Sequence, residues 1–280
     1  MRLGAPVFLK TEDPAELARA HRAEGYRAAY CPRWLTLDAP DRIREAEAAF
    51  AREDVVIAEV GAWGNLIGPD VEKRQRNLDL AQERLALADA VGARCCVDYA
   101  GTFAADSDYG PHPKNFAQDG FDFIVETIRT VIDAVKPKRA RFGLEMMPWS
   151  FPESVDDYVR LLAAVDRPAF AVHLDPVNIV TSPRRYFESG ALIRECFARL
   201  GPHIVSCHGK DVELRPNYMA DLRECPPGQG GLDYRAFLTE LNALPQEPPL
   251  MLEHLPGEAE YRAARDYVVG VAREAGLSFE

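Results

Sequence analysis

Long apolar runs are missing from this 280-residue chain, and none approaches the roughly 20 residues that a membrane-spanning helix needs. The first residues, from Met1 to Pro6, also lack the extended apolar region and the cleavage site of a secretory signal peptide. We therefore expect a cytoplasmic protein with no membrane partner.

Cysteine is present but forms no recognisable motif. The six residues show neither a CxxC spacing nor the density of a disulfide framework, and four of them fall within apolar segments. They are Cys31, Cys95, Cys96, Cys196, Cys207 and Cys225. We expect reduced, mostly buried thiols without a metal or redox role.

Two common nucleotide-binding signatures are also missing. No GxGxxG follows the first apolar segment, and no GxxxxGK(S/T) occurs in the chain. Basic charge is scarce as well, because 33 lysines and arginines face 44 acidic residues, which gives a formal charge of −11. A surface of that sign repels phosphate backbones, so we expect no nucleic-acid partner. A small anionic substrate is still compatible, since it experiences the local field.

What the sequence does contain is a regular alternation of short apolar segments and helical segments. Helix starts are marked by capping residues such as Asp13, Asp70 and Ser154. The alternation predicts a parallel sheet covered by helices, and a count of eight favours a closed (β/α)8 TIM barrel of the α/β class. We expect one domain over residues 1–280, with a long loop at 209–232 that covers the active face. The eight predicted strands span residues 3–9, 27–31, 55–60, 93–99, 141–145, 170–175, 203–210 and 249–254.

Four successive predicted strands end on a residue that can bind a divalent metal: Glu145, Asp175, His208 and Glu253. The intervals of 30, 33 and 45 residues between these positions each fit one strand, one loop and one returning helix. In a barrel, the C-terminal strand ends form the active face, so we expect the four side chains to meet. Each alone could be a strand-end cap or part of a loop ion pair, but four at the same end favour a metal site. Three carboxylates and one imidazole suit Mn²⁺, Mg²⁺ or Co²⁺ better than structural zinc.

Two residues next to these ligands are candidate substrate contacts. His173 lies two residues before Asp175 and therefore shares its face of an extended strand. It is interpreted as a support for the metal site, a substrate-hydroxyl contact or a plain buried histidine. Lys210 shares the face of His208, where it either holds a substrate oxygen or offsets the carboxylates, or has no functional role.

Aromatic and acidic residues near other strand ends complete the candidate pocket. Trp63 and Trp149 fall in loops after the third and fifth strands, where an aromatic ring either stacks on a sugar or simply packs the loop. Glu59 and Asp98, at the ends of the third and fourth strands, are weaker candidates for binding hydroxyl groups.

Five segments carry the metal-binding and glycine pattern. They are Leu144-Glu145, His173-Leu174-Asp175-Pro176-Val177-Asn178, His208-Gly209-Lys210-Asp211, the glycine loop 227–234 and Leu252-Glu253-His254. Together they resemble the xylose isomerase-like superfamily of sugar isomerases and epimerases. The sequence is most similar to the group of ketose 3-epimerases, inosose dehydratases and hydroxypyruvate isomerases, and the resemblance extends over essentially the whole chain.

The resemblance implies a divalent-metal-dependent isomerase or epimerase acting on a keto sugar or related polyol. It implies that Glu145 and Glu253 act as acid and base around a metal-stabilised enediolate. Mn²⁺ is the favoured ion, with Mg²⁺, Co²⁺ or Zn²⁺ as alternatives. Asn178 stands where many relatives carry a substrate-contacting histidine, so this candidate substrate contact departs from the family pattern. A small sugar or polyol is the expected partner, and a homo-oligomer stays open.

Three other functions stay open from the sequence. A metal-dependent lyase, like the inosose dehydratases or the C-glycoside deglycosidases, starts with the same proton abstraction, so the ligand residues do not separate it from an isomerase. A zinc nuclease acting on abasic DNA needs additional histidines, which strands two to four do not supply at their ends. A barrel that only binds a sugar is the non-enzymatic interpretation, and the two glutamates at the metal site argue against it.

Overall fold

The computed structural model describes residues 1–279 and contains a closed barrel of eight parallel strands. The prediction of a (β/α)8 barrel is therefore confirmed, whereas a single domain over the whole chain stays a prediction. In barrel order the strands are β1 (Leu3–Gly4), β10 (Leu250–Leu252), β7 (Ile204–Gly209), β6 (Phe170–Leu174), β5 (Arg141–Glu145), β4 (Cys95–Asp98), β3 (Val56–Gly61) and β2 (Ala28–Tyr30).

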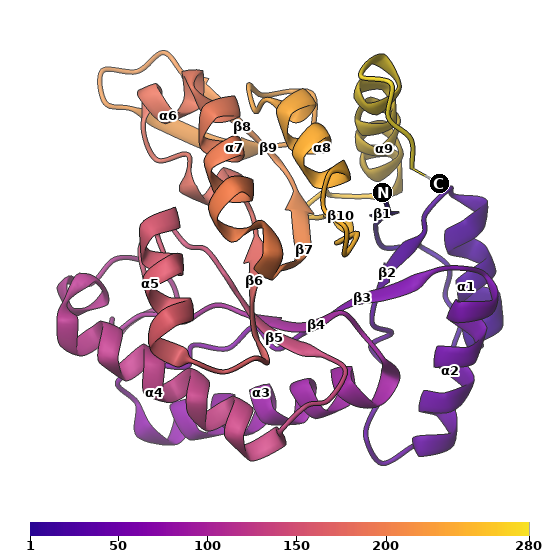
Figure 1. Ribbon diagram of the computed structural model, residues 1–280, viewed down its shortest axis with the longest axis horizontal. Helices are drawn as coiled ribbons and strands as arrows, with labels where there is room; N and C mark the ends of the chain where they lie inside the picture. The colour runs from indigo at the N-terminus through magenta and orange to yellow at the C-terminus, as the bar shows by residue number, and fades with distance from the viewer. Residues whose placement is uncertain (280) are drawn as a thin grey trace.

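Helices surround the barrel in Figure 1 and return the chain from the end of one strand to the start of the next. None of them, within the described residues, is long and apolar enough to cross a membrane. They are α1 (Pro14–Ala23), α2 (Pro40–Arg52), α3 (Val71–Val91), α4 (Gln118–Val135), α5 (Val155–Val165), α6 (Pro183–Phe187), α7 (Ser189–Leu200), α8 (Tyr234–Asn242) and α9 (Glu258–Glu274), with 3-10 turns at η1 (Pro113–Phe116), η2 (Val177–Ile179) and η3 (Gly201–His203).

The elements form where local sequence favours them. All five residues of β6 are buried, because a parallel strand packs against side chains inside the barrel and against helices outside it. Helix α3 begins after the predicted cap Asp70, whose carboxylate accepts a hydrogen bond from the Lys73 amide, and ends at Gly92 in the left-handed conformation (φ 71°). The capping residues thus fix where the helices begin and end, and hence where the strand ends fall.

The first strand is shorter than predicted from the sequence. It covers Leu3–Gly4, whereas an apolar run to residue 9 was expected. Pro6 has no amide hydrogen and cannot continue the hydrogen-bond ladder, and Phe8 and Leu9 are exposed. The segment after β1 therefore belongs to the loops at the C-terminal end of the barrel.

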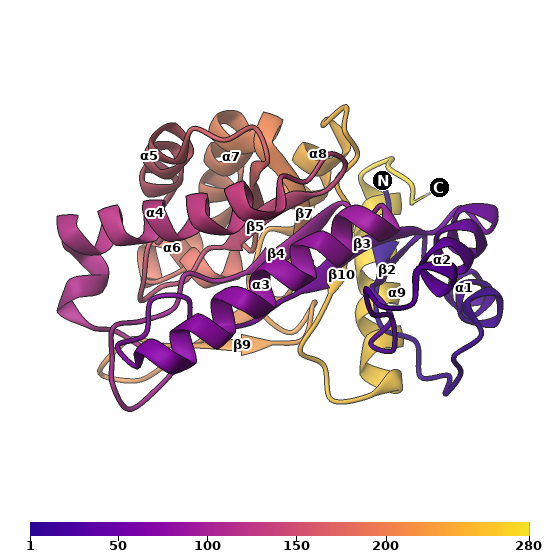
Figure 2. The same cartoon turned by 90° about the horizontal axis from the view of Figure 1, so that it is seen from below.

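Segment 209–232, predicted as a loop, contains an antiparallel hairpin of β8 (Asp211–Arg215) and β9 (Asp221–Cys225). The hairpin follows β7 directly, so its base lies at the C-terminal end of the barrel strands. In Figure 2, β9 lies toward one side of the barrel and the two chain ends toward the other. At the hairpin tip, Tyr218 and Met219 are exposed.

Candidate active site

Four side chains meet at the C-terminal end of the barrel. Glu145 is the last residue of β5, Asp175 follows β6, His208 lies in β7 and Glu253 follows β10, and these strands are consecutive in the barrel. One donor atom from each residue lies within 4.8 Å of the donor atoms of the other three. Atoms that bind one ion at about 2.0–2.4 Å lie at most about twice that distance apart, so the arrangement fits a single ion.

His208 lies at the centre of this group. Its Nδ1 atom is 2.8 Å from Glu253 Oε1, 3.1 Å from Glu145 Oε1 and 3.9 Å from Asp175 Oδ2. The other ring nitrogen, Nε2, lies 3.2 Å from Glu59 Oε2. The imidazole therefore has three carboxylates on one side and a fourth on the other.

The Lys210 ammonium adds positive charge to the same group. Its Nζ atom lies 2.5 Å from Glu253 Oε1, 2.8 Å from Asp175 Oδ2 and 3.7 Å from Glu145 Oε1. The side chain is almost fully buried, so these ion pairs are poorly screened by solvent. The contacts support the interpretation that Lys210 offsets the carboxylates, and a contact with substrate stays a prediction.

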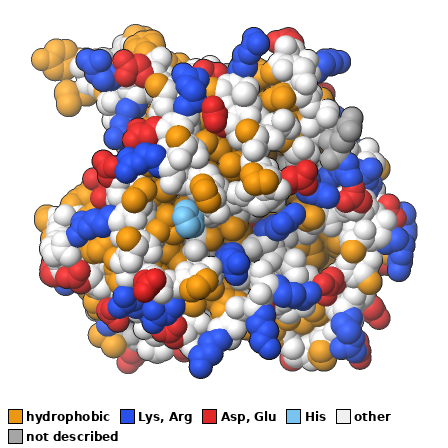
Figure 3. Space-filling model, in the orientation of Figure 1, with side chains coloured by type: hydrophobic (Ala, Val, Ile, Leu, Met, Phe, Trp, Pro, Cys, Tyr) orange, Lys and Arg blue, Asp and Glu red, His pale blue; other side chains and the backbone are white. Residues whose placement is uncertain are grey.

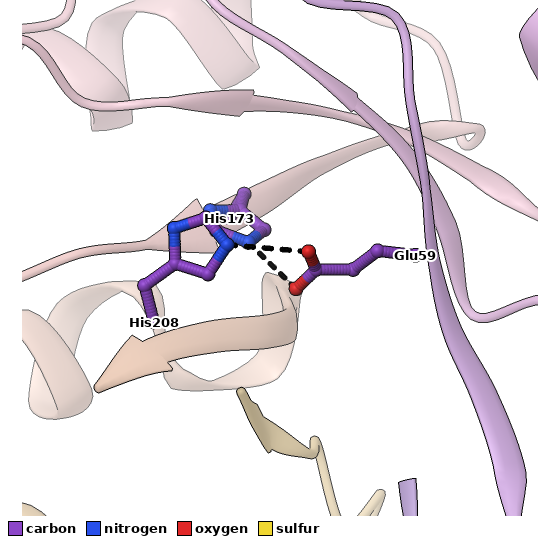
Figure 4. A group of neighbouring side chains, drawn as sticks. All are labelled: Glu59, His173 and His208. Carbon is purple, nitrogen blue, oxygen red and sulfur yellow. Dashed lines mark hydrogen bonds and ion pairs between the residues drawn. The ribbon is translucent and has the colours of Figure 1, made fainter. Parts of the chain in front are cut away.

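Glu59, on β3, has a more central place than its sequence position indicated. Figure 4 shows its carboxylate facing the rings of His173 and His208. Oε1 lies 2.9 Å from His173 Nε2 and accepts a short hydrogen bond from Ser206, while Oε2 lies 3.2 Å from His208 Nε2. All four side chains are buried. Glu59 therefore connects β3 to β6 and β7 through the interior of the barrel.

His173 packs against His208, with ring centroids 4.2 Å apart and ring planes at 72°. It is fully buried, and its Nδ1 atom has no hydrogen-bond partner among residues 1–279. Of the three interpretations offered by the sequence, this geometry supports a residue that holds His208 in place more than one that touches substrate.

Burial and charge act against each other on the protonation of these groups. Burial raises the pKa of Asp175 to about 6, although the neighbouring Lys210 charge opposes this shift. Burial would also raise the pKa of Glu145, but the charge and hydrogen bond of His208 together with Lys210 lower it well below its ordinary value. Burial would lower the pKa of His208, yet the surrounding carboxylates, Glu253 foremost, raise it well above its ordinary value.

The residues at this site fit a divalent cation. Asp175 Oδ2 and Glu253 Oε1 are buried and, within the described part of the chain, accept no hydrogen bond, although both lie at ion-pair distance from Lys210. The group contains four carboxylates, counting Glu59 behind His208, against the two basic side chains Lys210 and His208, so the cluster has an excess of negative charge that a divalent ion would offset. Carboxylate oxygens with one imidazole nitrogen are donors that Mn²⁺, Mg²⁺ and Co²⁺ accept.

A cavity of about 900 Å³ is bordered by Glu145 and Glu253 and by several aromatic residues. The Trp63 ring forms part of its wall, with its centroid 6.2 Å from that of His208. Trp63 and His254 have φ of +52° and +56°, a left-handed conformation that is unfavourable for bulky residues and is often found at functional sites. Contact of Trp63 with substrate stays a prediction, which its place in the cavity wall supports.

Asn178 and Trp149 lie in different environments. Asn178 Nδ2 donates a hydrogen bond to Glu145 Oε1 at 3.1 Å, so it touches a candidate ligand directly. Trp149 packs edge-on against Tyr99 and Tyr109, with ring centroids 6.0 and 6.1 Å away, and these two tyrosines line the cavity in its place. Direct contact of Trp149 with substrate stays a prediction, and the geometry supports a role behind the cavity wall.

The base of the hairpin reaches the rim of the cavity. Glu224 on β9 lies 3.0 Å from His254 Nδ1 and 3.6 Å from Lys210 Nζ. The residues that line the cavity come from other segments, and none belongs to the described hairpin strands. In this conformation the hairpin therefore borders the cavity and does not cover it.

The family now follows from the sequence as a whole, because residues 17–269 match the model of the xylose isomerase-like TIM barrel. This chain belongs to that family. The resemblance inferred from the short motifs is confirmed. No curated protein sequence gives a significant match.

Solved structures of very different proteins share the xylose isomerase-like barrel. Endonuclease IV from Thermus thermophilus superposes with a TM-score of 0.72 at 15% identity, over 98% of this chain and 100% of that one. The 3-keto-D-glucoside 4-epimerase from E. coli gives 0.66 at 16% identity, over 96% and 98% of the two chains. A xylose isomerase-like protein from Mycobacterium smegmatis, solved with magnesium, gives 0.65 at 20% identity, over 93% and 88%. At these identities the superpositions establish the fold.

Proposed function

We propose that the protein is a divalent-metal-dependent isomerase or epimerase acting on a keto sugar or a related polyol. The convergence of Glu145, Asp175, His208 and Glu253 carries this proposal. In the barrel, β5 and β10 are separated by β6 and β7, so the two glutamates approach from the two flanks of the group. Two flanking carboxylates are suited to removing a proton at one position of a substrate and returning it at another.

Glu145, Asp175, His208 and Glu253 would hold the cation, for which Mn²⁺ is our first choice. When bound, the ion supplies a Lewis acid that polarises a substrate carbonyl and stabilises the negative charge that develops there. The protein's own part is to fix the ligands: Glu59 orients the His208 ring, and Asn178 donates a hydrogen bond to Glu145.

We assign the proton transfers to the two glutamates. Glu253 is the more accessible, since 12% of its side chain is exposed against 4% for Glu145, and both border the cavity. One carboxylate takes the proton from the carbon beside the carbonyl, and the other returns a proton. A carboxylate with a pKa of about 4.3 is a weak base in water, so a closed site from which water is excluded is needed for the reaction.

Lys210 and Trp63 are the proposed substrate contacts with the best support. The Lys210 ammonium, at ion-pair distance from two ligands, can also bind a substrate oxygen. Trp63 presents a partly exposed indole to the cavity, on which the C–H face of a sugar can stack. A polar, acidic floor and aromatic walls are suited to a neutral polyol.

A metal-dependent lyase is the alternative that uses the same residues. Elimination of water or of a glycosyl group begins with the same proton abstraction and differs in what leaves the neighbouring carbon. A nuclease is less favoured, because the formal charge of −11 repels a DNA backbone. The product formed from the substrate distinguishes these reactions.

Solvent-deuterium uptake by a panel of keto sugars and inososes, with Mn²⁺-loaded protein, tests the proposal. We expect deuterium at a carbon beside the carbonyl, with a new epimer or isomer as product; loss of water or of a glycosyl group identifies a lyase instead. Absence of exchange from every substrate, with metal content verified, would count against proton-transfer chemistry at this site.

Substitution of the two glutamates tests their roles. Glu145→Gln and Glu253→Gln should each lower the exchange rate by about 10²–10⁴-fold, the usual contribution of a general acid or base. Glu83→Gln, an exposed position on α3, is the matched control and should leave the rate unchanged. If Glu253→Gln retains its metal and exchanges deuterium at the wild-type rate, Glu253 is not an acid or base.

A further inference from the structure

A second cavity lies at the opposite, N-terminal end of the barrel. Its volume is about 680 Å³, and its lining includes residues at the starts of strands, such as Val56 of β3, Arg141 of β5 and Ile204 of β7. The proposed reaction does not use this end, because its four ligands lie at the C-terminal strand ends. The volume is within the usual range for small-molecule sites.

Arginines gather around this cavity. Arg94, Arg139 and Arg141 line it, and Arg2 forms an ion pair with Asp54, a further lining residue. In Figure 3, several Lys and Arg side chains surround the middle of the face toward which the chain ends lie. The chain as a whole has a formal charge of −11, so this cluster of basic side chains is opposite in sign to the net charge.

The arginines differ in their partners. Arg139 lies 2.7 Å from Glu47 and also donates hydrogen bonds to two backbone carbonyls near the end of α3. By contrast, the Arg94 and Arg141 side chains form no ion pair or hydrogen bond with any residue in the described range 1–279. These two guanidinium groups therefore have their full donor capacity free.

The strand starts that carry Arg94 and Arg141 are neighbours in the barrel. The Arg141 amide donates to the Arg94 carbonyl at 3.3 Å, so their side chains leave neighbouring strand starts and border the same cavity. Both residues are only partly exposed. Burial and the nearby charge of Arg2 lower the pKa of Arg94, while Glu247 opposes the shift. Two partly buried, unpaired cations are unfavourable alone, and an anion between them would offset that cost.

We propose that the N-terminal mouth of the barrel binds a small oxyanion, a phosphate or a carboxylate, between Arg94 and Arg141. A guanidinium group binds both kinds of oxyanion through two parallel N–H···O hydrogen bonds, which gives affinity and orientation together. The rest of the cavity has room for the body of a ligand that carries the anionic group.

Calorimetric titration with inorganic phosphate and, separately, with citrate tests this site. We expect saturable binding of one anion per chain, and the preferred probe identifies phosphate or carboxylate as the recognised group. Arg94→Gln and Arg141→Gln should each weaken binding by about tenfold or more, the loss expected for a charge-assisted hydrogen-bond pair. Arg141→Lys keeps the charge but lacks the two-pronged donor, so it should also bind more weakly.

Arg76→Gln, on the exposed side of α3, makes the same change of charge away from the cavity and should bind like the wild type. Manganese binding at the other end of the barrel serves as the check that each variant is folded. If a glutamine variant fails this check, the anion affinity of Arg141→Lys is compared with that of the wild type instead. The proposal is overturned if neither anion binds saturably, or if the cavity variants and Arg76→Gln have equal affinity.

Discussion

Glu59 determines which nitrogen of His208 faces the proposed metal. An ionised carboxylate only accepts hydrogen bonds, so the Nε2 atoms of His173 and His208 must donate to it. Because Nε2 keeps its hydrogen, loss of the Nδ1 proton would leave the Nδ1 lone pair free for a cation held between Glu145, Asp175 and Glu253. That is the tautomer a metal ligand requires, and a buried carboxylate behind the ring is a common way to fix it.

Glu59→Gln should therefore weaken metal binding. The glutamine side chain has the same size, but its amide nitrogen cannot accept a hydrogen bond, so one of the two histidines loses its partner. We expect the affinity for Mn²⁺, measured by calorimetry, to fall by about 10- to 100-fold with the barrel still folded.

Asp98→Asn is the matched control. Asp98 is equally buried at the end of β4, but its carboxylate accepts from the amides of Gly64 and Tyr99. Burial raises its pKa well above the ordinary value, which these amides oppose, and asparagine keeps an acceptor oxygen for the two amides. We expect unchanged Mn²⁺ affinity. Equal affinities for Glu59→Gln, Asp98→Asn and the wild type would show that Glu59 does not orient His208.

The sequence identifies some residues of the candidate site and not others. Glu145, Asp175, His208 and Glu253 are found because each closes a strand-like segment, and a barrel brings such ends together. The importance of Glu59 depends on contacts with residues more than 100 positions away, which local spacing does not encode. Trp149 was a candidate substrate contact because its loop follows a strand. A loop position after a strand does not determine which aromatic ring faces the cavity.

At the scale of elements, Asp211 organises the glycine loop that follows the hairpin. Its carboxylate accepts hydrogen bonds from the amides of Val212, Gly228, Gly230 and Leu232. One buried carboxylate thus holds the base of β8 and the return of the chain toward α8.

Asp211→Asn should destabilise the protein. The amide keeps one acceptor oxygen and places N–H hydrogens against backbone donors, so some loop amides lose their partner while buried. We expect a loss of about 2–3 kcal/mol in the free energy of unfolding, measured with urea. Asp70→Asn, an N-cap change of the same atoms, should be nearly neutral. Equal effects of the two substitutions would mean that the carboxylate does not hold the loop.

Predictability differs among the elements for physical reasons. Helices α1, α3 and α5 begin after the predicted caps Asp13, Asp70 and Ser154, because capping is a local interaction. The β8–β9 hairpin is not predicted, since three prolines and four glycines in segment 209–232 are more typical of a loop. Its pairing depends on the register of the two strands, which short-range propensity alone does not determine.

At the scale of the whole molecule, the last helix is tied to the first. Glu24, just after α1, forms ion pairs with Arg262 and Arg265 of α9 at 2.6 and 2.8 Å. The hydrogen bond from Arg262 lowers the pKa of Glu24, with the charges of both arginines adding to it and burial opposing. This small network joins the two ends of the helix ring beside the pairing of β1 with β10.

Because the pKa of Glu24 is lowered by folding, its ion pairs stabilise the fold above the ordinary carboxylate pKa, and that contribution is lost as the pH falls through the lowered value. Glu24→Gln should cost about 1 kcal/mol of unfolding free energy near neutral pH, since the network is partly exposed. The difference from the wild type should shrink at about pH 3, where unfolding in urea gives the comparison. A difference that is equal at both pH values would rule out the ionic contribution.

The barrel itself is the most predictable feature, because eight alternations of strand and helix have few ways to close. The basic cavity at the N-terminal end was not predicted, since its arginines come from the starts of strands far apart in the sequence and carry no motif. These arginines can be recognised as a cluster at one end of the barrel only when the alignment of the strands is known.

The position of bound manganese shows whether Glu145, Asp175, His208 and Glu253 form the metal site. Crystals grown with Mn²⁺ and measured at a wavelength where manganese scatters anomalously should show one strong peak at the C-terminal end. It should lie about 2.0–2.4 Å from donor atoms of Glu145, Asp175, His208 and Glu253. A peak between Glu59, His173 and His208 instead, or no peak in crystals of protein shown to contain the metal, would contradict the account.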